Sequence, residues 1–130
     1  MAKVKWIDVD IYKCQLAVFI GGHEEFKKWV KKEYTDPSEE GFVELVMEST
    51  DEAQASLWWN GDRSCIIELP YWPRKPKELG WANHELLHST FHILDGARVE
   101  YHKGESNESF TYLLEYLTRN LYDKEGYETV

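Results

Sequence analysis

The sequence predicts a single α+β domain over residues 1–130, in which a mixed or antiparallel sheet packs against helices. Three observations favour this class. Apolar and polar side chains alternate near the N-terminus, an Asn-Gly pair separates two strand-like runs in the middle, and two long helix-like segments occupy the last third. A chain of 130 residues is long enough to bury one core without disulfides.

The first element is a strand pattern that changes phase. In residues 7–11 apolar side chains alternate with aspartates, and from Cys14 to Ile20 the apolar residues occupy the other phase. This change predicts a strand that is broken or bulged near Tyr12-Lys13. Gly21-Gly22 is expected to end it.

Residues 24–34 have the spacing of an amphipathic helix. Aromatic and branched residues repeat at three- and four-residue intervals, and the lysine pairs between them predict a solvated face. Asp36-Pro37-Ser38 is a turn signal, and Gly41 to Glu48 is expected to form a further strand.

Asn60-Gly61 is the strongest hairpin signal in the chain. It lies between two strand-like runs, Ala55 to Trp59 and Ser64 to Leu69. The prolines that follow, Pro70, Pro73 and Pro76, predict a stiff connection into the next helix.

The most specific chemical pattern is His84-Glu85-Leu86-Leu87-His88. It lies on a helix expected from about Lys77 to Asp95, whose apolar residues cover most of the circumference, so we expect this helix to be buried. Residues four apart share a helix face, with Cβ atoms about 5–6 Å apart, so both imidazoles can bind one Zn²⁺. Glu85 flanks that ion and is the expected general base toward a water molecule.

A catalytic zinc takes three protein ligands and leaves one position to water, so a third ligand is required. Glu108 is the expected one. It lies in a second helix-like segment, Asn107 to Leu117, and two antiparallel helices joined by a loop could bring it to the histidine pair.

The pattern HExxH, an intervening loop and then Asn-Glu opening the next helix resembles the gluzincin branch of the zinc metallopeptidases, to which thermolysin belongs. The resemblance covers about residues 77–124. It implies a minimal zincin-like domain in which His84, His88 and Glu108 bind zinc and Glu85 is the general base. The small size of the chain and the sequence of its last long helix also resemble zincin-like proteins of phages and mobile elements.

The chain departs from the thermolysin-like pattern at Tyr112, where the family has an aspartate that orients a zinc-binding histidine. Glu115 returns to the same helical face as Glu108 and could take the place of that aspartate. The residue that stabilises the oxyanion stays open among Tyr101, His102, Tyr112 and His92.

Two further histidines need interpretation. His92 continues the four-residue series but lies about 12 Å along the helix axis from His84, too far for both to bind one ion. We expect it to contact a zinc ligand or to be an ordinary half-buried histidine. His23 is expected at the surface. The alternative interpretation of the motif itself is a metal-free hydrogen-bond network, because buried His and Glu side chains need partners.

Composition limits the class of partner and the compartment. A net charge of −9 argues against broad nucleic-acid binding and fits either solubility or mimicry of nucleic acid toward a basic partner. Cys14 and Cys65 are expected to be small buried apolar residues. No signal peptide is visible, and the longest apolar run, Leu16 to Ile20, is too short to cross a membrane. We therefore expect a cytoplasmic protein without membrane contact.

The expected function is a zinc-dependent hydrolase of the metallopeptidase type that acts on a peptide or protein. In zincins the strand before the motif helix often forms the edge of the cleft, which here would be Ser64 to Leu69. The alternative, favoured by the acidity and by the lack of a recognisable prosegment, is an acidic zinc-containing binding protein that keeps the zincin fold and blocks a partner. Hydrolysis of a non-protein amide is a third possibility.

Overall fold

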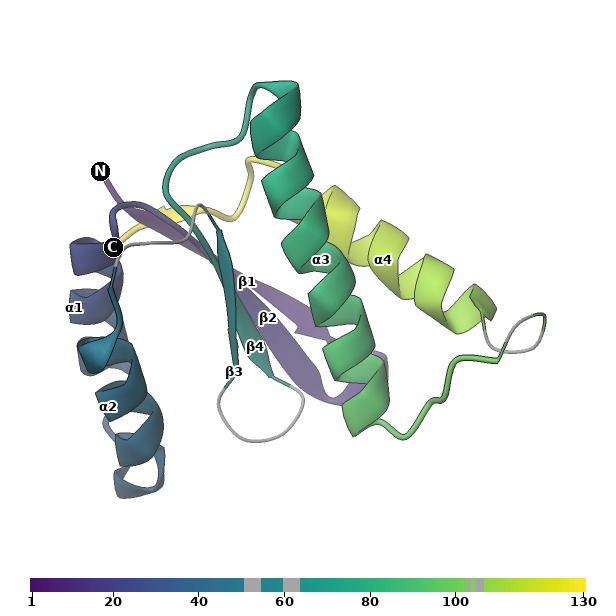
Figure 1. Ribbon diagram of the computed structural model, residues 1–130, viewed down its shortest axis with the longest axis horizontal. Coiled ribbons are helices and arrows are strands. Elements are labelled where there is room, and N and C mark those ends of the chain that lie inside the picture. Colours follow the sequence, from purple (N-terminus) through teal and green to yellow (C-terminus); the bar gives the residue numbers. More distant parts are fainter. Residues whose placement is uncertain (51–54, 60–63, 103, 105–106) are drawn as a thin grey trace.

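A computed structural model describes residues 1–50, 55–59, 64–102, 104 and 107–130. These residues form an α+β arrangement, as the sequence predicts, and it contains five strands, four α-helices and two short 3-10 turns. Figure 1 labels the elements: β1 (Lys3–Val9), η1 (Asp10–Tyr12), β2 (Cys14–Ile20), α1 (His23–Glu33), η2 (Pro37–Glu39), α2 (Glu40–Glu48), β3 (Ser56–Trp59), β4 (Cys65–Leu69), α3 (Pro76–Gly96), α4 (Asn107–Tyr122) and β5 (Glu128–Thr129).

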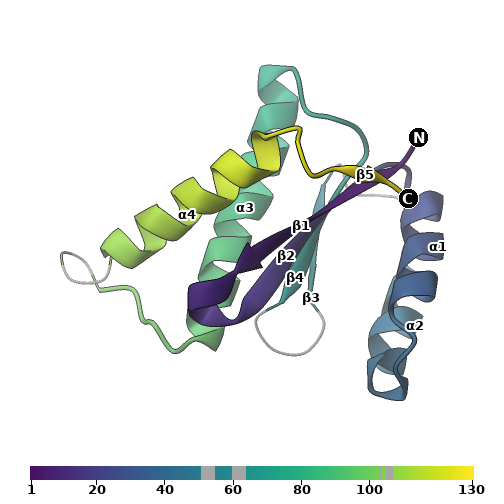
Figure 2. The same cartoon turned by 180° about the vertical axis from the view of Figure 1, so that it is seen from behind.

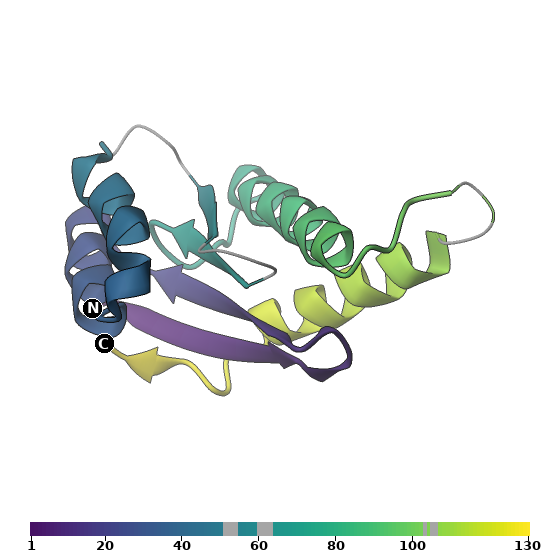
Figure 3. The ribbon, with the colours of Figure 1, turned by 90° about the horizontal axis from the view of Figure 1, so that it is seen from below.

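The five strands form one mixed sheet in the order β3-β4-β2-β1-β5. β2 and β4 are parallel, and the other neighbouring pairs are antiparallel. Helices cover both faces: α1 and α2 lie on one side of the sheet, and α3 and α4 lie on the other (Figures 2 and 3). Since strand side chains alternate between faces, Leu16 and Val18 of β2 join the α3–α4 core, whereas Ala17 and Phe19 join the α1–α2 core.

The break predicted near Tyr12-Lys13 is confirmed, and the chain reverses there. β1 and β2 pair as a hairpin in which Ile7 faces Leu16 and Val9 faces Cys14. Lys13 adopts the left-handed conformation, with φ 53°, that closes the turn. The phase change in the sequence therefore keeps the apolar side chains of both strands on one face.

The prediction of a strand from Gly41 to Glu48 is wrong, because this segment forms helix α2. Phe42 and Val46, four residues apart, are buried together against α1 and the sheet. The turn before it starts at Pro37, where the Asp36 carboxylate accepts a hydrogen bond from the Ser38 backbone N–H at 2.9 Å. The nine residues of α2 have the spacing of a helix, but several of them also have a high propensity for strands, which led to the wrong prediction.

The two strands of the predicted hairpin are confirmed as the antiparallel neighbours β3 and β4, while Asn60-Gly61 lies outside the described residues. The expectation that Ser64 to Leu69 forms a sheet edge is wrong. β4 pairs with β3 on one side and with β2 on the other, and all five of its residues are buried. A strand that is covered on both faces has a continuous run of apolar residues in its sequence, and β4 has such a run apart from Glu68. The edge strand beside α3 is β3.

Helices α3 and α4 confirm the two helices predicted in the last third. The Glu78 carboxylate accepts hydrogen bonds from the backbone N–H groups of Arg74 and Lys75 at the start of α3. The helices are antiparallel: the Tyr122 hydroxyl at the end of α4 donates to Asn83 Oδ1 at 2.9 Å, near the start of α3. Within the described residues, no helix combines the length and apolar character needed to cross a membrane.

Candidate functional site

The two motif histidines lie together on α3. His84 Nε2 and His88 Nε2 are 3.1 Å apart, and the two rings meet edge to face with centroids 4.6 Å apart. Two nitrogen ligands at about 2.0–2.1 Å from a tetrahedral zinc would lie about 3.3–3.4 Å apart. The pair therefore fits two adjacent coordination positions with little movement of either ring.

Helix α3 is less buried than its composition predicts. Ala82, Leu86, Ile93 and Leu94 are fully buried against the sheet and α4, whereas the opposite face meets solvent. Leu87 is 46% exposed and Phe91 45% exposed. Both imidazoles of the motif lie on this solvent-facing side, where an incoming ligand can reach them.

Glu85 is the buried member of the motif, with 8% of its surface exposed. Burial raises the pKa of its carboxyl group above the usual value for glutamate, while the neighbouring charges of His84 and His88 oppose this rise. A carboxylate with a raised pKa accepts a proton more readily near neutral pH than an exposed one does.

A hollow of about 440 Å³ opens between α3 and the edge strand β3, and it is lined by Leu57, Trp59, Glu85, His88 and His92. The Glu85 carboxylate, the His88 imidazole and the edge strand β3 thus line the same hollow. This hollow is the candidate substrate site beside the motif in the part of the chain that the structure describes.

His92 is half-buried, as one of the two expectations for it states, and it faces the same hollow. Its ring packs on Trp59, with centroids 5.2 Å apart and an interplanar angle of 31°. Its Nε2 atom is buried without a hydrogen-bond partner among the described residues. Of the four candidates for stabilising an oxyanion, His92 lies beside Glu85.

The other three candidates lie away from this hollow. The Tyr101 ring packs on Phe110 at 5.2 Å, and His102 Nε2 contacts Glu100 Oε2 at 3.1 Å, both in the segment after α3. Tyr112 is largely exposed on α4.

Glu108 lies in the first turn of α4, in a separate hollow beside η1. Helix α4 lies on the side of α3 away from β3 (Figures 1 and 2), and the hollow that Glu108 lines contains neither His84 nor His88. Among the described residues, no group of three or more His, Cys, Asp or Glu side chains could hold a metal ion. The residues present therefore fit two zinc ligands, and Glu108 as the third ligand stays a prediction. Glu115 is exposed on α4.

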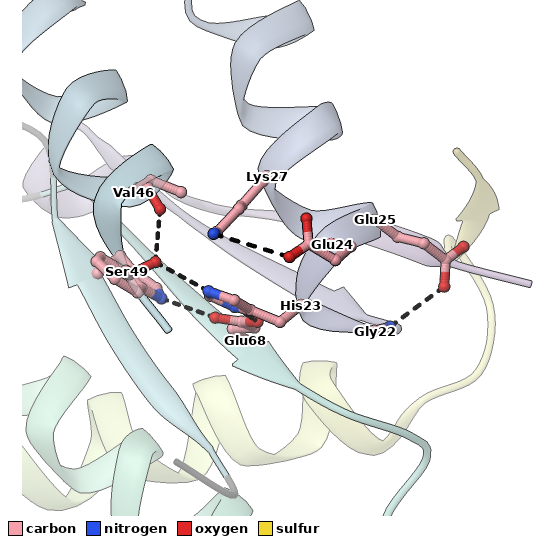
Figure 4. A network of polar contacts seen from close by, with 9 residues as sticks. Gly22, His23, Glu24, Glu25, Lys27, Val46, Ser49 and Glu68 are labelled. Atoms are coloured by element: carbon pink, nitrogen blue, oxygen red, sulfur yellow. Dashed lines mark hydrogen bonds and ion pairs between the residues drawn. The ribbon is translucent and has the colours of Figure 1, made fainter. Parts of the chain in front are cut away.

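A buried polar network around His23 was missed by sequence reasoning, and the expectation of a surface residue there is wrong. His23 Nδ1 contacts Glu68 Oε2 at 2.6 Å, and His23 Nε2 contacts Ser49 Oγ at 2.9 Å (Figure 4). The Trp58 indole N–H donates to the other carboxylate oxygen of Glu68 at 3.0 Å. The signal was Glu68 itself, because a carboxylate inside an apolar strand requires a partner.

This network has the residue types of a Ser-His-Glu triad, but its hydrogen bonds run the wrong way for a nucleophile. The Ser49 hydroxyl donates to the carbonyl of Val46, so it accepts from His23 Nε2. The Ser49 hydroxyl proton is therefore directed at a backbone carbonyl and not at a ring nitrogen that could accept it as a base. The network joins α1, the end of α2 and β4, which is a structural role.

The remaining sequence expectations concern the cysteines. Cys14 and Cys65 are both buried, as predicted, and the structure has no disulfide between them. Burial raises the pKa of the Cys65 thiol to about 12, so this group stays protonated and is a poor metal ligand at neutral pH.

Comparisons with protein-family models, with curated proteins and with solved structures found no match to this chain.

Proposed function

We propose that this protein is a zinc-dependent hydrolase of the metallopeptidase type, with His84 and His88 as zinc ligands and Glu85 as general base. The observation that carries the proposal is the 3.1 Å separation of the two Nε2 atoms beside a buried carboxylate. A bound zinc ion would supply Lewis acidity and lower the pKa of a water molecule to about 7.

The chain's own residues account for the proton transfers. Glu85 accepts a proton from the attacking water, whose oxygen bonds to the carbonyl carbon of the substrate. It then passes this proton to the amide nitrogen as the C–N bond breaks, so that the amine leaves neutral. The raised pKa of Glu85, caused mainly by burial, supports both steps.

Strand β3 supports a peptide as the substrate. It is an edge strand beside the hollow, and its Leu57 and Trp59 line that hollow with Glu85. An unpaired strand edge can accept an extended peptide through main-chain hydrogen bonds. The substrate strand would then run along β3 and place a peptide bond near Glu85.

A second function is an acidic zinc-containing binding protein that blocks a partner without hydrolysis. Two observations favour it: the net charge of −9, and the lack, among the described residues, of a group of three possible metal ligands. This function does not require the third ligand and the fixed coordination geometry that a catalytic zinc needs.

Digestion of a broad peptide library by the zinc-loaded protein separates the two functions. We expect cleavage by the wild-type protein and a loss of several orders of magnitude in Glu85→Gln, because this change keeps the side-chain shape but removes the base. His102→Ala, which changes an exposed histidine outside the hollow, is the matched control and should cleave normally. Zinc-loaded wild-type protein that cleaves no peptide would contradict the hydrolase and favour the binding protein.

A further inference from the structure

A second hollow, distinct from the one beside the motif, lies between η1 and the N-terminal half of α4. Its volume is about 610 Å³, within the range of about 300–1,000 Å³ typical of ligand sites. It contains no residue of the HExxH motif. The lining residues that matter here are Asp10, Ile11, Tyr12, Glu108, Tyr112 and Tyr116.

Two tyrosines form fixed walls of this hollow. The Tyr116 hydroxyl donates a hydrogen bond to the backbone carbonyl of Asp8 at 2.6 Å, which ties α4 to β1. Tyr12 packs against the α3–α4 core. Two further lining residues are open to solvent: Ile11 is 81% exposed and Tyr112 is 66% exposed. Apolar side chains gathered around a preformed hollow indicate a contact surface.

The acidic side chains that line the hollow favour a positively charged ligand. The carboxylates of Asp10 and Glu108 both line the hollow and are exposed, and within the described residues neither forms an ion pair. Lys13, on the adjacent turn, lines a neighbouring hollow and also forms no ion pair among these residues. Glu108 has a structural role at the helix N-terminus, but Asp10 has no comparable helix to stabilise.

Tyrosine rings and carboxylates together favour a cation with an apolar body. The face of an aromatic ring attracts a cation, and a guanidinium also stacks on the ring while it bonds a carboxylate through two N–H groups. An ammonium lacks this planar fork. The net charge of −9 would draw a basic partner toward the surface.

We propose that this hollow binds an arginine side chain presented by a peptide segment of a partner protein. The guanidinium lies between Asp10 and the tyrosine rings, and an apolar residue next to the arginine packs on Ile11. The hollow contains no HExxH residue, and the variants that test it change no predicted zinc ligand, so a negative result leaves the proposed function untouched.

Titration of the ¹⁵N-labelled 130-residue protein with two peptides tests the proposal. The probe is acetyl-Leu-Arg-Leu-amide, and the control peptide has citrulline, the neutral analogue of arginine. We expect amide shifts concentrated at residues 9–12 and 108–116 and an affinity at least about fivefold higher for the arginine peptide. This preference should shrink as salt is raised.

Protein variants locate the contact. Asp10→Asn and Tyr112→Leu should each weaken binding of the arginine peptide by about threefold or more, because each removes one of the two attractions. Glu44→Gln, an exposed carboxylate on α2 across the sheet, is the control and should bind as the wild type does. All three variants should melt cooperatively and keep the zinc content of the wild type.

Three results would overturn the proposal: no shifts at millimolar peptide, equal affinity for the arginine and citrulline peptides, or shifts that map outside the hollow. Equal binding by Asp10→Asn and wild type would also overturn it. Wild-type protein that binds no zinc but still binds the arginine peptide would count against the proposed function and not against this site.

Discussion

Replacement of His23 by alanine tests the buried network most directly. The change removes the imidazole between Glu68 and Ser49 and leaves the Glu68 carboxylate, 8% exposed, with the Trp58 indole as its described hydrogen-bond partner. Loss of one partner from a buried charged pair costs about 3–5 kcal/mol. Ser49→Ala removes one hydrogen bond from the same ring and should cost only about 1 kcal/mol.

The double variant His23→Phe/Glu68→Leu separates the charge from the packing. Phe26 lies 6.0 Å from the His23 ring, so an apolar ring at position 23 has an aromatic neighbour. Replacing both partners of a buried pair by apolar groups is often close to neutral, so the double variant should be more stable than His23→Ala.

Urea denaturation followed by tryptophan fluorescence measures these differences, since the chain has six tryptophans and Trp58 belongs to the network. The free energy of unfolding should fall in the order wild type, Ser49→Ala, His23→Ala. A decrease in unfolding free energy below about 1 kcal/mol for His23→Ala would refute the reasoning, because a buried carboxylate that loses its partner should destabilise the protein by more than this.

Three further experiments test other parts of the structure. In metal-free protein, Glu85→Gln should be at least as stable as wild type at neutral pH. Burial raises the pKa of Glu85 in the folded state, so ionisation of this carboxyl group destabilises the wild type as pH rises past the pKa that it has in the unfolded chain, and not in acid. Thermal melts at acidic and neutral pH measure this difference. Cys14 and Cys65 should react with a thiol reagent only after denaturation, since both are buried, and a colorimetric thiol assay measures this. Ile66→Pro and Ile67→Pro should both destabilise the protein by about 3 kcal/mol or more, because β4 has a ladder on both sides; a cooperative wild-type-like melt for either one would contradict the strand order.

Much of the fold follows from local patterns in the sequence. The phase change near Tyr12 predicts a break between β1 and β2, and the Asn-Gly signal predicts the antiparallel pairing of β3 and β4. Helix α3 follows from its apolar spacing, which predicts a helix from about Lys77 to Asp95. These features depend on residues close in sequence, so period and turn chemistry suffice to find them.

The errors concern contacts between distant segments. Strand β4 is internal because β2, some fifty residues earlier in the chain, pairs with it in parallel, and the apolar run of β4 was the available sign of this burial. Helix α2 was mistaken for a strand because its valines and phenylalanine suit either structure. His23 becomes buried only when α1 docks on Glu68 of β4, which no local pattern reveals.

For the candidate site, spacing alone predicted the pairing of His84 with His88, because four residues of helix fix it. The position of Glu108 depends instead on how α4 packs against α3. Spacing along the sequence does not determine that packing, and the same applies to the hollow between α3 and β3.

Zinc content of the purified protein tests the central claim most directly. After loading with Zn²⁺ and removal of free metal, elemental analysis should give stoichiometric zinc for wild type and for the control His102→Ala, and little for His84→Ala or His88→Ala. Glu108→Ala tests the predicted third ligand: loss of most zinc would support Glu108 in that role, and an unchanged zinc content would rule it out. Wild-type protein that retains no more zinc than the His84→Ala variant would contradict the account of this site.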